Sequence, residues 1–416
     1  MHNFQLECTT CGERYHAAAS TGDVRSYCLE CGTKLEQYSH NQVLRTLLLS
    51  TASLVLLIPA NVYPLLRFSF QGQWRENEII TGSVLLFQQN SPVVAFAVFF
   101  TSVVAPFVLH GMISTAALGM LTGWYPRLTR NLWRWLFEFE EWGMIDVYLV
   151  ALGVGAIKLL SMGSVDPEPG LWMVLLFVLT SGICVGSMNA CAIWTEWRMR
   201  HAEKDDVPEI TDGASVTCYH CGTVQAEDAV ESCLICRAPL HQRELDESKT
   251  WAYLLAAVAL YVPANVLPVM NLSIVGDKAD YTVMGGIMYL WREDDYLPAS
   301  IVFCGSVIVP VLKMVVLFAL LFTHRLGRYQ KFQTALYRVV KTLGRWSMVD
   351  LFVLGVLVAL GQMGVVATVE PKLGAVAFCG VVIFTMFAAN SYQAWWIWTR
   401  HPDPKTDKTY AYGTSS

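Results

Sequence analysis

The stretch Pro59–Pro64 reads PANVYP, and Pro263–Pro268 reads PANVLP. Two further motifs repeat in the same order, SVVAP (102–106) as SVIVP (306–310) and WGMID (142–146) as WSMVD (346–350). Each second copy lies 204 positions after the first, and no gap is needed between the matches. Self-similarity over such a length indicates that one structural unit has been duplicated.

The repeated unit has the composition of a membrane protein. Hydrophobic residues make up 54% of the chain and charged residues only 15%, and each long apolar run is long enough for the roughly 20 residues that cross a bilayer core. The runs lie at about 43–66, 91–121, 142–163 and 170–195, and again at about 251–270, 298–323, 346–365 and 374–399. We therefore predict an all-α polytopic membrane protein with eight transmembrane helices, built as a tandem duplication.

Positive charges predict the orientation, because short cytoplasmic loops are enriched in Lys and Arg. Arg127, Arg130 and Arg134 follow the second run, and a similar basic set follows the sixth. These loops are expected to face the cytoplasm, which places both termini there. The first forty residues are polar and contain four cysteines, so they do not resemble a signal peptide.

Eight of the 12 cysteines form CxxC pairs, two pairs ahead of each apolar block. A CxxC pair presents two thiolates to one ion, and two pairs complete a tetrahedral four-sulfur site. The predicted ligands are Cys8, Cys11, Cys28 and Cys31 in the first site and Cys218, Cys221, Cys233 and Cys236 in the second. Cytoplasmic thiols stay reduced and so small a domain needs a metal to fold, so we interpret both sets as structural zinc ribbons. Iron in the same geometry and redox-active dithiols are the alternatives.

These features divide the chain into five parts. They are a cytoplasmic zinc ribbon (1–40), a block of four transmembrane helices (41–200), a linker with the second cytoplasmic ribbon (201–248), a second block of four helices (249–400) and a cytoplasmic tail (401–416).

Charged residues inside the predicted helices are the candidates for function. Asp146 and Asp350 occupy equivalent positions about one turn into the third and seventh helices. Lys313 lies ~15 Å from the cytoplasmic end of the sixth helix, and Lys158 lies in the outer part of the third. A charge at such depth is costly unless it is paired or hydrated. We expect Lys313 to pair with Asp350 and His110 to approach Asp146, although such groups can also serve only to tie helices together.

The PANVxP motif ends the first helix of each block. Its prolines remove amide donors and free helix carbonyls, one of which its asparagine can satisfy. The residues concerned are Pro59, Asn61 and Pro64 in the first copy and Pro263, Asn265 and Pro268 in the second. A shaped helix end is one interpretation, and an opened backbone that lines a polar cavity is the other.

Shorter segments complete the pattern. The apolar stretches near 79–88 and 281–291 are too short to span and are predicted to be interfacial or re-entrant. Residues 127–139 and 332–343 separate apolar from basic side chains and predict amphipathic helices against the headgroups. No GxxxxGK[ST] loop, HExxH helix or GxSxG elbow occurs, so we do not expect an enzyme.

Two cysteine ribbons ahead of two four-helix blocks, with PANVxP and with GRWSMVDLF at Gly344–Phe352, resemble the paraquat-inducible protein A family of PqiA-like and LetA-like proteins. The resemblance covers nearly the whole chain. It implies an inner-membrane protein of Gram-negative bacteria that works with MCE-domain proteins, whose periplasmic tunnels carry phospholipid between the two membranes, and no nucleic-acid partner. It also implies an intramembrane path for lipid or protons, with these matching positions: Lys158, Ser306, Lys313, Ser347, Asp350 and Thr385.

The two copies differ at several of these positions. Lys158 aligns with Gln362, Lys313 aligns with Leu109, and Ser347 aligns with a glycine. The second block is therefore the expected home of the site. A lipid-handling transporter subunit is the first hypothesis, a non-transporting scaffold or sensor that anchors an MCE protein is the second, and a membrane redox protein is the third.

Overall fold

The computed structural model describes most of the chain. The described residues are 3–8, 10–18, 24–38, 41–70, 72–123, 126–160, 163–188, 193–194, 196–197, 215–218, 221, 224–226, 232–238, 247–274, 277–292, 294, 296–323, 329–361 and 367–398.

The first block runs from α1 to α7. Its elements are α1 (Gln42–Val62), β5 (Leu66–Phe70), β6 (Gln73–Asn77), α2 (Ile79–Gln88), α3 (Pro92–Phe99), the π-helix η1 (Phe100–Val104), α4 (Ala105–Thr122), α5 (Pro126–Phe139), the 3-10 helix η2 (Glu140–Trp142), α6 (Ile145–Leu160), β7 (Ser164–Pro167) and α7 (Pro169–Ser187).

The second block has the same elements in the same order, as the duplication requires. They are α9 (Ser248–Val266), β10 (Met270–Ile274), β11 (Asp277–Tyr281), α10 (Val283–Arg292), α11 (Tyr296–Phe303), the π-helix η3 (Cys304–Ile308), α12 (Val309–Thr323), α13 (Gln330–Leu343), the 3-10 helix η5 (Arg345–Met348), α14 (Val349–Gly361), β12 (Ala367–Pro371) and α15 (Leu373–Ser391), followed by the short η6 (Ala394–Ile397).

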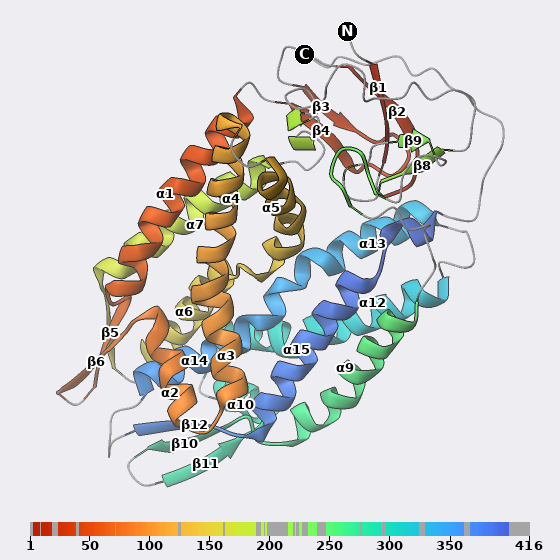
Figure 1. Cartoon of the computed structure of the whole chain (residues 1–416). Coiled ribbons are helices and arrows are strands. Elements are labelled where there is room, and N and C mark those ends of the chain that lie inside the picture. Colours follow the sequence, from red (N-terminus) through yellow and green to blue (C-terminus); the bar gives the residue numbers. More distant parts are fainter. Residues whose placement is uncertain are drawn as a thin grey trace.

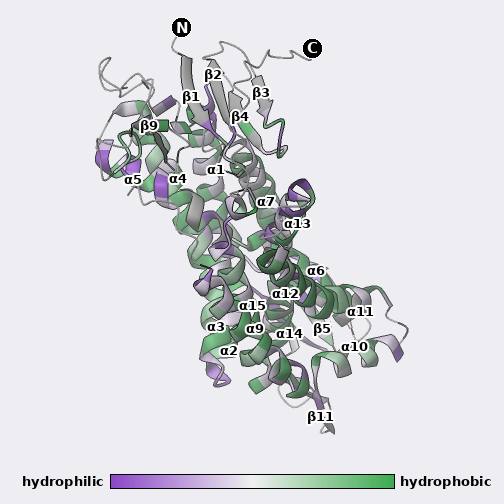
Figure 2. Cartoon of the chain, turned by 90° about the vertical axis from the view of Figure 1, so that its right-hand side faces the viewer, coloured by the Kyte–Doolittle hydropathy of each residue, from purple (hydrophilic) through white to green (hydrophobic). Residues whose placement is uncertain are grey.

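All eight apolar runs contain a helix, and six helical stretches are long and apolar enough to cross a membrane. Those six are Gln42–Val62, Pro92–Thr122, Pro169–Ser187, Ala299–Thr323, Gln330–Gly361 and Leu373–Ser391. The count is smaller than the predicted eight because α6 has only 16 residues and α9 does not meet both criteria. Figure 2 shows hydrophobic residues gathered along the helices and hydrophilic ones mainly toward the two ends of the molecule, for example at α5 and beside α10. The chain is a multi-pass membrane protein.

The two blocks pack together around α14. The long helices of each block lie side by side, α1 with α4 and α7, and α9 with α12 and α15 (Figure 1). The third helices, α6 and α14, meet between the blocks, and α14 also contacts α2 of the first block. Every residue from Leu351 to Leu360 is buried. The backbones of α2 and α14 approach closely enough to bury α14, because a Cβ on Gly82 of α2 would lie 2.7 Å from the carbonyl oxygen of Gly355.

A small antiparallel sheet lies on each block at the end opposite the ribbons (Figure 1). The strand orders are β6-β5-β7 and β11-β10-β12, and Leu66, for example, pairs with both Asn77 and Pro167. Sequence periodicity does not predict these strands, because β7 has four residues and β5 five. Each sheet fastens the end of a block's first helix to the start of its last.

Both helix-breaking motifs take the same form in the two blocks. The side-chain amide of Asn61 donates to the carbonyl of Leu57 at 2.8 Å, and that of Asn265 donates to the carbonyl of Tyr261 at 2.9 Å. α1 and α9 continue past their internal prolines and end at Val62 and Val266. In each copy the asparagine of the motif thus satisfies a carbonyl near the end of the block's first helix.

Both π-helices also fall at equivalent positions, and each ends two residues before the proline of its SVxxP motif. A proline lacks the amide hydrogen that a regular helix needs, and wider turns are common beside such breaks and at functional sites. Ser102 in η1 and Ser306 in η3 are buried, and their hydroxyls donate to the carbonyls of Val98 (2.7 Å) and Val302 (2.6 Å).

Short hairpins carry the cysteine pairs. They are β1 (Asn3–Glu7) with β2 (Arg14–Ala18), β3 (Val24–Tyr27) with β4 (Lys34–Tyr38), and β8 (Ser215–Thr217) with β9 (Val224–Ala226). All lie at the end of the molecule where the amphipathic helices α5 and α13 lie (Figure 1).

Candidate metal centres and intramembrane polar cluster

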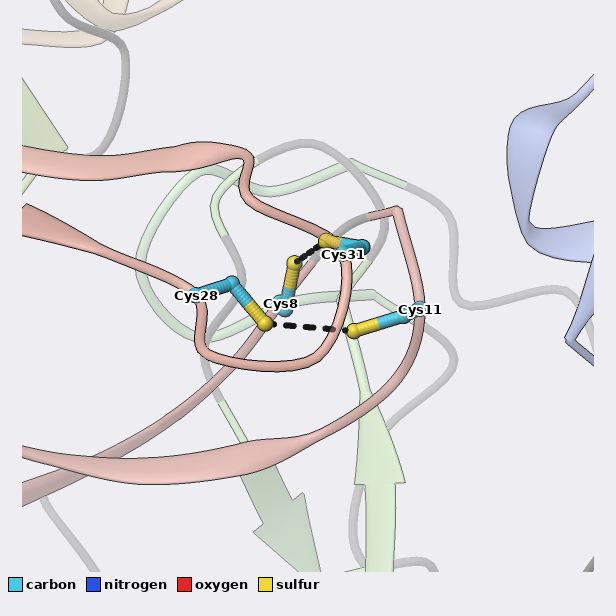
Figure 3. A group of neighbouring side chains, drawn as sticks. All are labelled: Cys8, Cys11, Cys28 and Cys31. Atoms are coloured by element: carbon cyan, nitrogen blue, oxygen red, sulfur yellow. Dashed lines mark hydrogen bonds between the residues drawn. The ribbon is translucent and has the colours of Figure 1, made fainter. Parts of the chain in front are cut away.

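The first four cysteines converge on one point (Figure 3). The Sγ atoms of Cys8 and Cys31 are 3.6 Å apart and those of Cys11 and Cys28 are 3.4 Å apart. The backbone turns tightly after each pair, because the amides of Gly12 and Gly32 bond to the carbonyls of Cys8 and Cys28. Gly12 has a φ of 79° and Gly32 a φ of 69°, a conformation that glycine adopts without strain.

The second set has the same geometry. Cys218 and Cys236 have Sγ atoms 3.4 Å apart, and Cys221 and Cys233 have Sγ atoms 3.6 Å apart. All four side chains are buried, whereas Cys11 of the first set is half-buried. Arg237 occupies the turn after Cys236 with a φ of 56°, where the first ribbon has a glycine. Gly222, which follows Cys221 as Gly12 follows Cys11, lies outside the described residues.

Both sets fit a tetrahedral metal ion. Four sulfurs at ~2.3 Å from one ion lie about 3.8 Å from each other, close to the distances here. The thiols also cannot all ionise unaided: hydrogen bonding with Cys11 lowers the pKa of Cys31, whereas hydrogen bonding with Cys28 raises the pKa of Cys11. A bound cation removes this conflict, because it stabilises all four thiolates together. The two clusters can therefore each hold a metal ion.

Lys313 is the centre of a polar cluster within the second block. Its side chain on α12 is fully buried, and its ammonium donates to Thr385 of α15 at 2.9 Å and to Ser347 of η5 at 3.3 Å. Thr385 in turn donates to the carbonyl of Val382 at 2.9 Å. The three residues come from three separate elements, so the cluster depends on how α12, α15 and η5 pack. A buried ammonium among apolar helices is costly and marks a site.

Two of the predicted site residues have side chains outside the described part of the structure. Asp350 is the second residue of α14, three positions after Ser347, and its pairing with Lys313 stays a prediction. Lys158 lies near the end of α6, and its role also stays a prediction. Asp146 lies in the first turn of α6 and is half-buried.

The first block has an uncharged counterpart of the lysine cluster. The Nε2 atom of His110 on α4 lies 2.9 Å from the hydroxyl of Ser181, and its ring packs edge-on against Phe177 at 5.4 Å. Ser181 aligns with Thr385, and His110 stands one position after the residue aligned with Lys313. In the described residues no hydrogen bond or ion pair joins His110 to Asp146 as predicted: Nε2 of His110 contacts Ser181 of α7, and its Nδ1 is buried without a hydrogen-bond partner.

An apolar cavity of about 90 Å³ lies close to this cluster in the second block. It is bounded by β10, α10, η3, α14 and α15, with single residues from α6 (Val154), β11 (Tyr281) and α11 (Val302). Tyr281, Thr282 and Ser306 are its hydroxyl-bearing residues, and the others, such as Leu290 and Leu354, are apolar. Lys313 follows Ser306 by two helical turns, ~10 Å. The sequence pointed to Ser306 but not to the cavity, although the short apolar stretch 281–291 supplies one of its walls.

The fold and sites define a duplicated multi-pass membrane protein that has two four-cysteine clusters and, in its described residues, a buried lysine cluster. The model of the family described as paraquat-inducible protein A matches residues 43–198 and 248–402, one match to each block. The chain belongs to this PqiA family.

Named relatives cover the chain almost from end to end. The intermembrane transport protein PqiA of Escherichia coli is 28% identical over 393 residues, which are 92% of this chain and 93% of that protein. The lipophilic envelope-spanning tunnel protein A of Escherichia coli is 27% identical over 399 residues, 95% and 91% of the two chains. A probable intermembrane transport protein of Haemophilus influenzae is 26% identical over 408 residues, 94% and 95%. No solved structure matches the chain. These homologues are transport proteins and not enzymes.

Proposed function

We propose that this protein is the inner-membrane subunit of an MCE-type lipid transport system of a Gram-negative bacterium. In this role it moves phospholipid between the inner membrane and a periplasmic tunnel formed by an MCE-domain protein. The observation that carries the proposal is the position of one fully buried ammonium, Lys313, two turns from an apolar cavity. The names of the relatives support transport between membranes.

A phospholipid combines apolar chains with an anionic headgroup, so its site needs both kinds of surface. The cavity between α10 and α14 supplies apolar walls, and Ser306 supplies a hydroxyl. The Lys313 cluster supplies a buried ammonium together with the hydroxyls of Ser347 and Thr385. Lys158 lies near the C-terminal end of α6 and Asp350 near the N-terminal end of α14. Both are proposed to extend this path.

The cysteine ribbons have a structural part in the same proposal. Zinc is the proposed ion at both, because four-thiolate tetrahedral sites are typical of zinc and the ribbons are too small to fold on a hydrophobic core alone. Both ribbons and both termini are proposed to be cytoplasmic, which places the two small sheets at the periplasmic surface.

A non-transporting scaffold that only anchors an MCE protein is the second candidate. The close packing around α14 favours it, since Leu351–Leu360 are buried throughout. The cavity beside Ser306 is what distinguishes transport from anchoring.

The test places a photocrosslinking amino acid at position 290, in the cavity wall, in the full-length protein in cells. Leu86 is the matched control, because it is the repeat equivalent of Leu290 and is fully buried in the first block. Leu255, exposed on α9, reports bulk lipid. Transport predicts a phospholipid adduct at 290, none at 86, and loss of the 290 adduct, but not the 255 adduct, in Lys313→Met. An adduct at 255 alone would support the scaffold.

A further inference from the structure

Each ribbon lies against the block that it does not lead in the sequence. The guanidinium of Arg338, on α13 of the second block, donates from Nη2 to the carbonyl of Cys31 and to the hydroxyl of Thr33 in the first ribbon, both at 2.7 Å. Lys331 of the same helix approaches Glu30 at 3.7 Å. The first ribbon is thus bound by residues about three hundred positions away.

This contact reaches the surroundings of the metal ligands. The hydroxyl of Thr33 accepts from Arg338, lies 3.0 Å from Sγ of Cys31 and donates to Thr10 at 3.1 Å. Groups that hydrogen-bond to metal ligands orient them and tune the site. Trp398, which ends the second block, packs against the same cysteines and donates from its indole to Thr334 of α13 at 3.0 Å.

The second ribbon repeats the arrangement on the first block. Arg134 of α5 is the repeat equivalent of Arg338, and its Nη1 lies 3.5 Å from the carbonyl of Arg237, next to Cys236. Trp194 is the equivalent of Trp398 and belongs to the same buried cluster as the four cysteines of the second ribbon. The two blocks therefore present an equivalent arginine and tryptophan, each to the other block's ribbon, and the ribbons also touch where β1 meets β9.

α13, the helix that contacts the first ribbon, is followed in the chain by a residue of the Lys313 cluster. α13 runs into η5, whose Ser347 accepts a hydrogen bond from Lys313 at 3.3 Å. Arg338 and Ser347 are nine positions apart. Any displacement of α13 would therefore change the surroundings of the Lys313 ammonium.

We propose that the ribbons are crossed, metal-dependent straps, in which the ion held by the first ribbon fixes α13 and Ser347 of the second block, and the ion held by the second ribbon fixes α5 of the first. The metal orders the turn around Cys31, and that turn presents the carbonyl and hydroxyl that Arg338 binds. Loss of the ion removes the acceptors of Arg338 and releases α13. The effect on the Lys313 site rests on the proposed function, whereas the crossing itself does not.

The test follows amide hydrogen exchange in the full-length purified protein, together with metal content per chain. Cys31→Ser is expected to reduce the metal from two ions to one and to raise exchange about tenfold in α13 and η5 but not in α5. Cys236→Ser is expected to do the reverse. Exchange that rises only in residues 3–38 and α1 after Cys31→Ser would overturn the proposal.

A second variant keeps the test valid if the cysteine variants do not accumulate. Arg338→Ala leaves every cysteine in place, so both metal ions should remain while exchange in α13 and η5 still rises. Arg127→Ala, an exposed arginine of α5, is the matched control and should change neither region. Unchanged exchange in Arg338→Ala would contradict the strap. The lipid adduct at position 290 is a separate readout, so its absence from the wild-type protein would reject the transport function and leave the exchange pattern to decide the crossing.

Discussion

α2 and α10 are the same helix in the two copies, yet one closes against the protein interior and the other borders a cavity. A Cβ on Gly82 of α2 would meet backbone of α14 at 2.7 Å, whereas a Cβ on Gly286, its repeat equivalent, would meet nothing within 4 Å. α14 is buried against the first block's α2, whereas α10 makes no comparably extensive contact with α6 in the described residues. The pseudo-symmetry is broken at that place, and the cavity and the buried ammonium both lie in the half that stays open.

The largest expected difference between the halves concerns metal removal. A structural zinc ion contributes on the order of 10–16 kcal/mol to the folding of such a ribbon, so its loss should unfold the ribbon. The first ribbon should lose its ion first to a chelator, because Cys11 is half-buried whereas all four cysteines of the second ribbon are buried. Mass spectrometry of the intact protein during chelation measures the order, and simultaneous release would contradict this ranking.

Acid should also release the metal ion from the first ribbon. Hydrogen bonding with Cys11 lowers the pKa of Cys28 to about 7. A lowered pKa contributes stability that is complete above the ordinary value of the thiol and is lost as the pH falls through the lowered one. Metal retention by the first ribbon is therefore expected to be greatest at alkaline pH and to decline as the pH falls and protons compete for the thiolates. Metal content measured across this range checks the sign, and retention that increases on acidification would be inconsistent with thiolate ligation.

The glycine pair tests the packing difference directly. Gly82→Ala forces a methyl group against the backbone of α14, and such overpacking costs about 1–3 kcal/mol. Gly286→Ala meets open space and gains about 0.5–1 kcal/mol from a helix interior that prefers alanine. The midpoint temperature of thermal unfolding in detergent should therefore be lower than wild type for Gly82→Ala and slightly higher for Gly286→Ala. Equal shifts would mean that α2 and α10 are packed alike.

Some of this architecture could be predicted from sequence and some could not. The repeat fixes the element order, and the CxxC spacing identifies both metal clusters, because these depend on local chain geometry. Lys313 stands out because a charge inside an apolar run is rare. Its partners Ser347 and Thr385 came only with the family resemblance, since a hydroxyl in a membrane helix has little sequence signal of its own.

The failures share one cause, which is that repeat periodicity does not fix how helices face each other. His110 was paired with Asp146 because both are polar and in neighbouring helices, but Ser181 of α7 lies on the side of α4 that His110 faces. The crossed contact of Arg338 with Cys31 could not be predicted either, because both copies carry an equivalent arginine and an equivalent ribbon. The five-residue strands β5 and β10 are not predicted, because they are too short to show the two-residue alternation of apolar and polar side chains.

Hydroxyl deletions compare the charged cluster with its neutral counterpart. Thr385→Val removes an acceptor from a buried ammonium, and hydrogen bonds to charged groups contribute about 1.5–3 kcal/mol. Ser181→Ala removes the partner of a neutral histidine, with an expected cost of about 0.5–1.5 kcal/mol. The free energy of unfolding of each variant, measured under identical conditions and compared with the wild type, gives the difference. A larger loss for Ser181→Ala would show that charge is not what distinguishes the two clusters.

The smallest expected difference in stability between the two blocks is at the PANVxP motif, which both copies contain. Asn61 and Asn265 donate to equivalent carbonyls at 2.8 and 2.9 Å, so replacing either with alanine should cost the same, about 0.5–1.5 kcal/mol for one hydrogen bond. Equal losses of stability, with the phospholipid adduct at position 290 unaffected in both variants, would assign the motif to the helix end. If Asn265→Ala abolished that adduct while Asn61→Ala preserved it, at equal stability, the freed backbone of the second copy would instead belong to the path. The comparison is sharp because the two asparagines have the same local structure and differ only in which block surrounds them.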